Sequence, residues 1–192
     1  MELTHTNKGR LPLKIWKLQA DANHFNNFTL IDNSEWGILI NLDSFSGLPM
    51  IQKWKPFKVK VLKQRKEGDM QAFLGGVPVF SQKAVDKLRD FFHDNTELLP
   101  LDYNKGQYYA LNILNILDCI HYENAEFTTF SDGKIMRFEK YAFQKSKILD
   151  EHFFKIVDEP RGFSFVSDAF KAKVIDSGLS GFLFSEVWDS TN

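Results

Sequence analysis

The feature of this 192-residue chain that most constrains its fold is a change of apolar spacing within residues 161–188. A short apolar run at 163–166 is typical of a strand, and after Ser167 the apolar residues recur at helical spacing. The Ser167 hydroxyl can cap a helix, and Gly178 suits the left-handed residue that ends one. The segment predicts strand, helix, turn and a second strand at 182–187. The expected buried helix face is Phe170, Val174 and Ile175.

The same pattern occurs earlier, in residues 75–101. A strand at 77–80 is followed by Ser81 as a second expected helix cap, and Asn95 is the expected end of that helix. The apolar residues at helical spacing are Ala84, Val85, Leu88, Phe91 and Phe92. Two strand–helix–strand units, 75–101 and 161–188, predict an α+β fold with two helices packed on a mostly antiparallel sheet.

The remaining apolar runs predict further strands between well-marked turns. They lie at 13–18, 28–31, 37–42, 57–61, 108–120, 135–143 and 153–157. For 108–120 a helix is the alternative, although its aromatic and β-branched start favours a strand. We expect a single domain over residues 1–192, with a β-rich N-terminal lobe at 1–70 and an α+β region at 71–192.

Composition and charge are those of an ordinary soluble protein, apart from a high content of 19 phenylalanines, and we expect the protein to stay in the cytoplasm. Charged residues make up 26% of the chain and the net charge is −1. No apolar run is long enough to span a membrane, and the first residues lack the apolar core of a signal peptide. Cys119 is the single cysteine, which excludes a disulfide and agrees with a reducing compartment.

One segment, 52–66, concentrates positive charge without any acidic residue. Its basic residues are Lys53, Lys55, Lys58, Lys60, Lys63, Arg65 and Lys66. The favoured interpretation is an exposed edge strand, because lysine on an edge opposes pairing with other strands. The alternative is a nucleic-acid or small-ligand module, in which the lysines contact phosphate and the Trp54 ring stacks on a base.

Signals for catalysis are weak. No histidine pair has metal-binding helical spacing, and the chain has no zinc-binding or redox cysteine motif. The one local cluster, Asp118, Cys119 and His121, suggests a small cysteine hydrolase as a minor alternative, but a buried cysteine explains it more simply. We therefore predict no catalytic residue, no cofactor and no metal site.

Several segments together resemble a known family. They are GGVPVFSQKAVDKLRDFF, ELLPLD with YYALNIL, FSDGKIMRFEKYAF and RGFSFVSDAFKAKVIDSGLSGFLF, and they cover residues 75–188. Their order resembles bacterial immunity-type proteins found beside polymorphic toxins, a group long described as a domain of unknown function. The resemblance implies that the protein binds and neutralises a cognate protein toxin made by the same cell or its kin. It implies no catalytic residue.

If the protein covers the active surface of a toxin, its decisive residues should be exposed aromatic and acidic side chains, because a few anchors carry most of the energy of an interface. The candidates are Trp54, Asp102, Tyr103, Tyr108, Trp188 and Asp189. Tyr103 lies in the turn-rich segment LDYNKGQ, which we expect to face solvent. The alternative for each aromatic residue is that it covers the core.

Overall fold

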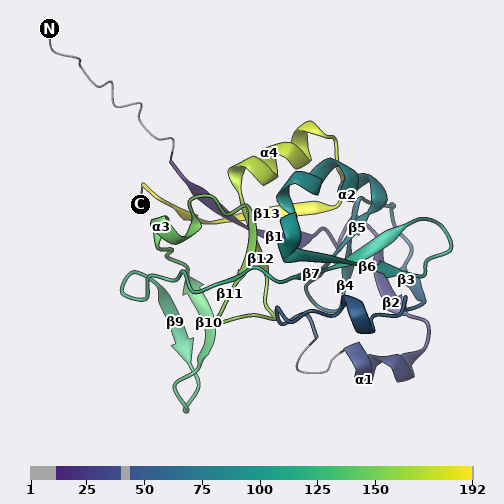
Figure 1. The fold of residues 1–192 in the computed structure, drawn as a ribbon, viewed down its shortest axis with the longest axis horizontal. Coiled ribbons are helices and arrows are strands. Elements are labelled where there is room, and N and C mark those ends of the chain that lie inside the picture. Colours follow the sequence, from purple (N-terminus) through teal and green to yellow (C-terminus); the bar gives the residue numbers. More distant parts are fainter. Residues whose placement is uncertain (1–11, 40–43, 192) are drawn as a thin grey trace, which may run out of the picture.

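The strands of the protein form two large mixed sheets and a separate hairpin (Figure 1). The structure is a computed structural model that describes residues 12–39 and 44–191. The five-stranded sheet runs in the order β13 (Phe182–Asp189), β1 (Lys14–Ala20), β12 (Ser164–Ser167), β11 (Phe153–Ile156) and β8 (Ile116–Leu117). The six-stranded sheet runs in the order β3 (Val59–Lys63), β2 (Asn27–Leu30), β4 (Met70–Phe73), β5 (Val77–Ser81), β7 (Tyr108–Ile113) and β6 (Thr96–Leu101).

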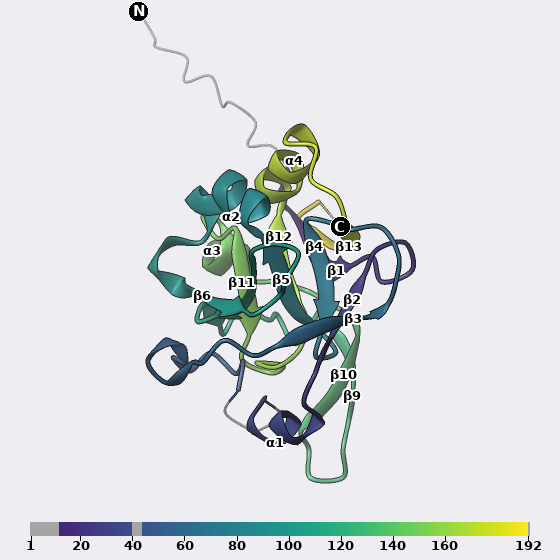
Figure 2. The same ribbon diagram turned by 90° about the vertical axis from the view of Figure 1, so that its right-hand side faces the viewer.

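Four α-helices and several short 3-10 turns are described beside these sheets. The helices are α1 (Trp36–Leu39), α2 (Gln82–Leu88), α3 (Lys145–Ile148) and α4 (Asp168–Asp176), and 3-10 turns occupy 33–35, 51–53, 89–91 and 93–95. The hairpin consists of β9 (Glu126–Thr129) and β10 (Ile135–Lys140). Figures 1 and 2 both show this hairpin projecting from the body on the side away from α2 and α4. Sheet and helix together give an α+β fold.

Two strand–helix–strand segments, β5–α2–β6 and β12–α4–β13, have the same arrangement. In the first, β7 lies between the two strands and is antiparallel to both; in the second, β1 does the same. Each helix therefore crosses between two parallel strands that are separated by an antiparallel one. The pairings of β2 with β4 and of β11 with β8 are parallel, so both sheets are mixed.

Both predicted helix caps are confirmed. The Ser81 hydroxyl accepts a hydrogen bond from the Ala84 N–H at 3.2 Å, and the Ser167 hydroxyl accepts one from the Phe170 N–H at 3.3 Å. Gly178 has a φ of +61°, as expected for the residue that ends α4.

The predicted faces of the two helices are confirmed except at Phe91, which is only partly buried, and at Ile175. In α2 and the turn after it, Ala84, Val85, Leu88 and Phe92 are buried, but the α-helix already ends at Leu88 and gives way to 3-10 turns before the expected end at Asn95. In α4, Phe170 and Val174 are buried. Ile175 is 61% exposed, so its assignment to the buried face is wrong. Ile175 directly follows Val174, and consecutive residues are rotated by about 100° around the helix axis, so its side chain lies away from the core.

The strand predicted at 37–42 is also wrong in its described part. Residues up to Leu39 belong to α1, while 40–42 lie outside the described residues. Leu39 is buried in the core enclosed by the six-stranded sheet. A run of alternating apolar residues this short does not distinguish strand from helix.

The N-terminal region shares its sheets with the rest of the chain. β1 lies between β12 and β13, whereas β2 pairs with β3 and β4. The segment 108–120 contains β7 and β8, which confirms the strand interpretation over the helix. The expected strands at 135–143 and 153–157 correspond to β10 and β11.

Asp69, directly before β4, joins the two sheets. Its carboxylate accepts hydrogen bonds from the N–H and the hydroxyl of Ser180 at 3.0 and 3.2 Å, and from the hydroxyl of Ser81 at 3.0 Å. The Lys83 ammonium lies 3.2 Å away. Burial alone would raise the pKa of Asp69, but the hydrogen bonds outweigh burial and hold the pKa below its usual value. The start of α2 is thereby fastened to the turn that precedes β13.

The edges of the six-stranded sheet meet just beyond β6. The Asp102 N–H donates to the Phe57 carbonyl at 2.9 Å, and the Val59 N–H donates to the Asp102 carbonyl at 3.0 Å. The Trp54 Nε1–H donates to the Pro100 carbonyl of β6 at 2.8 Å. These contacts curl the sheet around one core. That core contains Phe28, Leu30, Leu39, Phe45, Phe57, Val59, Phe73, Val77, Val79, Leu99, Leu101, Tyr103, Tyr108 and Ala110.

We predict that Ser167→Ala lowers the free energy of unfolding by about 1 kcal/mol, the usual effect of losing an N-cap. The substitution leaves a first-turn N–H of α4 without its acceptor and also removes the partner of His152 Nδ1, which lies 2.8 Å from the hydroxyl. Urea unfolding of the two proteins measures the difference. An unchanged midpoint would contradict the proposed role of the cap.

We predict a larger effect for Gly181→Ala, about 3 kcal/mol, because two penalties combine. Gly181 has a φ of +87°, and a Cβ at this position would overlap the carbonyl oxygen of Met70. Gly178→Ala is the matched control, since Gly178 also has positive φ but open space around it, and should cost about 1 kcal/mol. Equal losses in thermal unfolding would show that the close approach at Gly181 is unimportant.

Candidate functional site

Two surface grooves contain several of the residues predicted from the sequence. The β3 groove has a volume of about 470 Å³ and the β13 groove a volume of about 570 Å³. The β3 groove is lined by Ile31, Lys58, Val59, Lys60, Val61, Gln64, Asp102, Tyr103, Asn104 and Lys105. The β13 groove is lined by His121, Asn124, Lys140, Tyr141, Ala142, Phe143, Glu186, Val187, Trp188 and Asp189.

The β3 groove has an excess of positive charge. Lys58, Lys60 and Lys105 line it and are exposed, and among the described residues none of the three lies within ion-pair distance of a carboxylate. Asp102 is exposed and is the one acidic residue that lines this groove. β3 is an edge strand, as the lysine-rich segment predicted.

The two tyrosines predicted for an interface belong largely to the core. Tyr103 is 9% exposed and Tyr108 is 7% exposed, so the expected solvent exposure of Tyr103 is wrong. The Tyr103 hydroxyl lies 3.3 Å from a Glu67 carboxylate oxygen, and the Tyr108 hydroxyl donates to the Gly68 carbonyl at 3.0 Å. Burial, with a smaller effect of Glu67, raises the pKa of Tyr103. The curling of the sheet brings the predicted loop against Phe28, whose ring centroid is 4.7 Å from that of Tyr103.

Trp54 is half-buried and its ring is used within the fold. Its centroid lies 4.9 Å from that of Phe57 and 6.2 Å from that of Phe45, both in edge-on contacts. Its N–H is bonded to the Pro100 carbonyl. Stacking on a base needs a free ring face, so this arrangement does not favour the nucleic-acid interpretation of 52–66.

Trp188 and Asp189 lie together at the end of β13. The Trp188 ring is partly buried and meets the Phe143 ring edge-on at 5.8 Å. Asp189 is buried, lies 3.2 Å from the Lys14 ammonium and accepts a hydrogen bond from the Thr191 N–H at 2.9 Å. Asp189 therefore fixes the end of β13 to β1, whereas Trp188 presents part of its ring to the β13 groove.

The other titratable groups at the β13 groove, Tyr141, Glu159 and His121, are not arranged as a catalytic site. The Tyr141 hydroxyl donates to a Glu159 carboxylate oxygen at 3.0 Å, and burial raises the pKa of both groups. The Nδ1 of His121 is buried and has no partner among the described residues. Residues 12–39 and 44–191 contain no group of three or more side chains placed to hold a metal ion.

The thiol of Cys119 is poorly suited to nucleophilic catalysis. Cys119 is fully buried, and burial, assisted by the negative charge of Asp118, raises its pKa to about 12. A thiolate is the reactive form, and at neutral pH this thiol stays protonated. The packing places Cys119 in the core with Ile120 and Phe143, as the simpler sequence interpretation predicted.

Lys155 is a buried amine that the sequence did not single out. Its ammonium donates hydrogen bonds to the carbonyls of Phe45 and Pro160, each at 3.1 Å. Burial, with a smaller effect of Arg161, lowers its pKa to about 8. Because it is enclosed, Lys155 fastens the segment at Phe45 to β11 and is inaccessible to a substrate.

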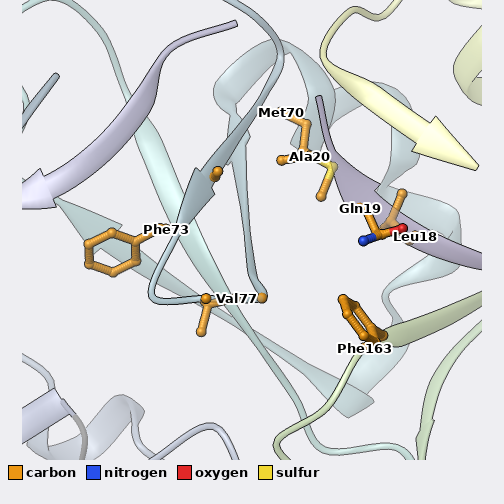
Figure 3. A pocket seen from close by; sticks show the side chains of 10 residues that line it. Leu18, Gln19, Ala20, Met70, Phe73, Val77 and Phe163 are labelled. Atoms are coloured by element: carbon orange, nitrogen blue, oxygen red, sulfur yellow. The ribbon is translucent and has the colours of Figure 1, made fainter. Parts of the chain in front are cut away.

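A smaller cavity of about 160 Å³ lies where β1 approaches β4 and β5 (Figure 3). Figure 3 shows Leu18, Met70, Val77 and Phe163 around it, with Gln19 as the polar side chain among those labelled. An apolar space of this size with one amide offers little to orient a ligand, so we assign it none.

The described surface is thus that of an α+β protein with two grooves, along β3 and along β13. None of the helices within residues 12–39 and 44–191 has the length and apolar character needed to cross a membrane. Comparison with family models matches residues 56–189 to the Immunity protein family (Imm11). The chain belongs to this family, which confirms the resemblance noted in the sequence. No curated protein matches the chain.

The matched region extends the resemblance at its N-terminal side. It begins before β3 and ends with β13. It therefore includes the lysine-rich edge strand, which lies outside the residues 75–188 that carried the resemblance in the sequence. Membership of an immunity protein family indicates toxin neutralisation as the general role.

We predict that native Cys119 does not react with a soluble thiol reagent at neutral pH, because the thiol is both buried and protonated. The reaction is followed by absorbance, first in buffer and then in denaturant, where the thiol should react at once. Fast stoichiometric reaction of the folded protein would contradict this assignment.

Proposed function

We propose that this protein binds a cognate bacterial toxin in the cytoplasm and neutralises it by covering the toxin's active surface. The observation that carries the proposal is the family match over residues 56–189. Neutralisation by occlusion requires a stable folded face and no chemistry of the inhibitor itself. The buried, protonated Cys119 supports binding over hydrolysis.

Three of the six residues named for an interface, Asp102, Trp188 and the half-buried Trp54, keep side-chain surface that a partner could reach. Asp102 is exposed in the β3 groove, and Trp188 is partly exposed in the β13 groove. Tyr103, Tyr108 and Asp189 are buried, and their contacts are those of structural residues. Substitution of the buried tyrosines would therefore report on folding and would not report on binding alone.

The alternative function is a nucleic-acid or small-ligand module that uses the segment 52–66. The unpaired lysines of the β3 groove favour an anionic partner of some kind. Against nucleic acid, the Trp54 ring is half-buried and is already in edge-on contact with Phe57 and Phe45. A protein partner fits the family and the groove together.

The test is to express the toxin domain encoded next to this gene with and without the protein. We expect growth to be restored and the two chains to co-elute as a stoichiometric complex. In a titration of purified toxin, activity should reach zero near one equivalent, because occlusion consumes one inhibitor for each toxin. The Cys119→Ala variant should protect equally well, since the thiol takes no part in binding.

Two results would overturn the proposal. Either the wild-type protein fails to protect and fails to co-elute with the toxin, or a small fraction of an equivalent inactivates all of the toxin over time. The second result, abolished in Cys119→Ala, would indicate the hydrolase.

A further inference from the structure

We infer that the β3 groove receives an extended acidic segment of the partner protein, which adds to the six-stranded sheet as a strand along β3. The identity of the partner as a toxin rests on the proposed function. The chemistry of the docking surface rests on the backbone, charge and side-chain pattern of β3 itself.

The first observation is an open backbone edge. The Ile31 N–H donates to the Lys58 carbonyl at 2.9 Å, so the backbone groups of Lys58 and Lys60 face β2, and those of Val59 and Val61 face the other way. The Val59 N–H is taken by Asp102. Along the described chain no group accepts from the Val61 N–H, which lies on the side of β3 away from β2, where β3 has no paired strand. An added strand can continue the pairing that Asp102 begins.

The second observation is uncompensated charge. Some lysines of the described surface lie within 4 Å of carboxylates, as Lys14 and Lys83 do at 2.8 and 3.2 Å, and others are unpaired but are not gathered along one groove. In the β3 groove Lys58, Lys60 and Lys105 have no such partner among the described residues. An acidic segment would supply the missing charge, and the attraction would speed the encounter and fix the register.

The third observation is the alternation of side chains across β3. Lys60 and Leu62 are exposed on one face, where Leu62 is 68% exposed, while Val59 and Val61 turn toward the enclosed core. A strand paired with β3 places its own side chains on the same two faces. The partner segment should therefore carry acidic residues on the lysine face and apolar residues on the other.

Nucleic acid fits this surface less well. Single-strand binding combines positive charge with aromatic rings on which bases stack. The aromatic residues nearest to the lysines, Trp54 and Tyr103, are half-buried and buried, and both are packed against other rings. An open N–H beside unpaired lysines matches a polypeptide, which supplies carbonyls as well as carboxylates.

The first experiment uses a labelled synthetic peptide of alternating glutamate and valine, and an oligothymidylate of equal charge as the competing probe. We expect the peptide to bind with an affinity that falls as salt is raised. The double variant Lys60→Glu, Lys105→Glu should weaken binding by about tenfold or more. The control variant Lys87→Glu, Lys173→Glu makes the same change in net charge on exposed lysines of α2 and α4 and should bind as the wild type does. Tighter binding of the oligothymidylate, or equal losses in both variants, would overturn the inference.

A substitution of Asp102 should raise the peptide affinity, whereas the lysine substitutions should lower it. Asp102→Asn removes the acidic charge that lines the groove while its backbone still bridges to β3. Peptide affinity should rise by about twofold to fivefold. A loss of affinity would instead favour a basic partner and would contradict the inference.

Amide hydrogen exchange tests strand addition directly. The Val61 amide should exchange rapidly in the free protein and slow at least tenfold in the complex. The Lys60 amide, which faces β2, is the internal control and should be slow in both states. Unchanged exchange at Val61 in a saturated complex would exclude strand addition.

The same variants separate this inference from the proposed function. If the wild type protects against the toxin and Lys60→Glu, Lys105→Glu protects as well as the control variant, the docking surface is wrong and neutralisation stands. If the wild type does not protect, the proposed function fails, and the peptide and exchange measurements still decide the chemistry of the β3 groove.

Discussion

The carboxylate of Asp69 is the contact on which the arrangement of the two sheets depends. It binds Ser81, whose hydroxyl caps α2, and Ser180, which lies in the turn between α4 and β13. One side chain thus connects the first strand–helix–strand segment to the second. The helices α2 and α4 contact each other. Leu88 and Phe92 from the first segment share one core with Phe170 and Val174 from the second. A carboxylate with several donors is held ionised, so this junction also keeps one fixed charge between the sheets.

The sequence allowed prediction of elements whose signals are local. Ser81 and Ser167 were identifiable because a cap depends on residues within one helical turn, and Gly178 because an αL residue follows directly. The curling of the six-stranded sheet was not predictable in this way. It depends on backbone hydrogen bonds of Asp102 with Phe57 and Val59. These residues are far apart in the sequence and come together only when the whole sheet has formed. For the same reason Tyr103, in a segment with turn composition, was assigned to the surface although it is buried beside Phe28.

The lysines on the β3 edge can both oppose pairing with another copy of the same edge and attract an acidic strand. Repulsion among lysines on β3 opposes association with another copy of the same edge. A strand of opposite charge meets no such barrier, and it gains the attraction that a neutral strand lacks. Discrimination between wrong and right partners then comes from one set of side chains, which combine attraction to the right partner with repulsion of the wrong one.

The position of β1 has a consequence for the order in which the protein is made and folded. Its two neighbours in the sheet, β12 and β13, follow it by well over a hundred residues; Lys14 and Glu186, which form an ion pair, are 172 residues apart. During synthesis Ile15 and Leu18 therefore emerge long before the strands that will bury them. The six-stranded sheet is complete once β7 has emerged, whereas the five-stranded sheet can close only after β13 has emerged. Non-local closure of this kind is slow, and β1 has neither of its sheet partners until β12 has emerged from the ribosome.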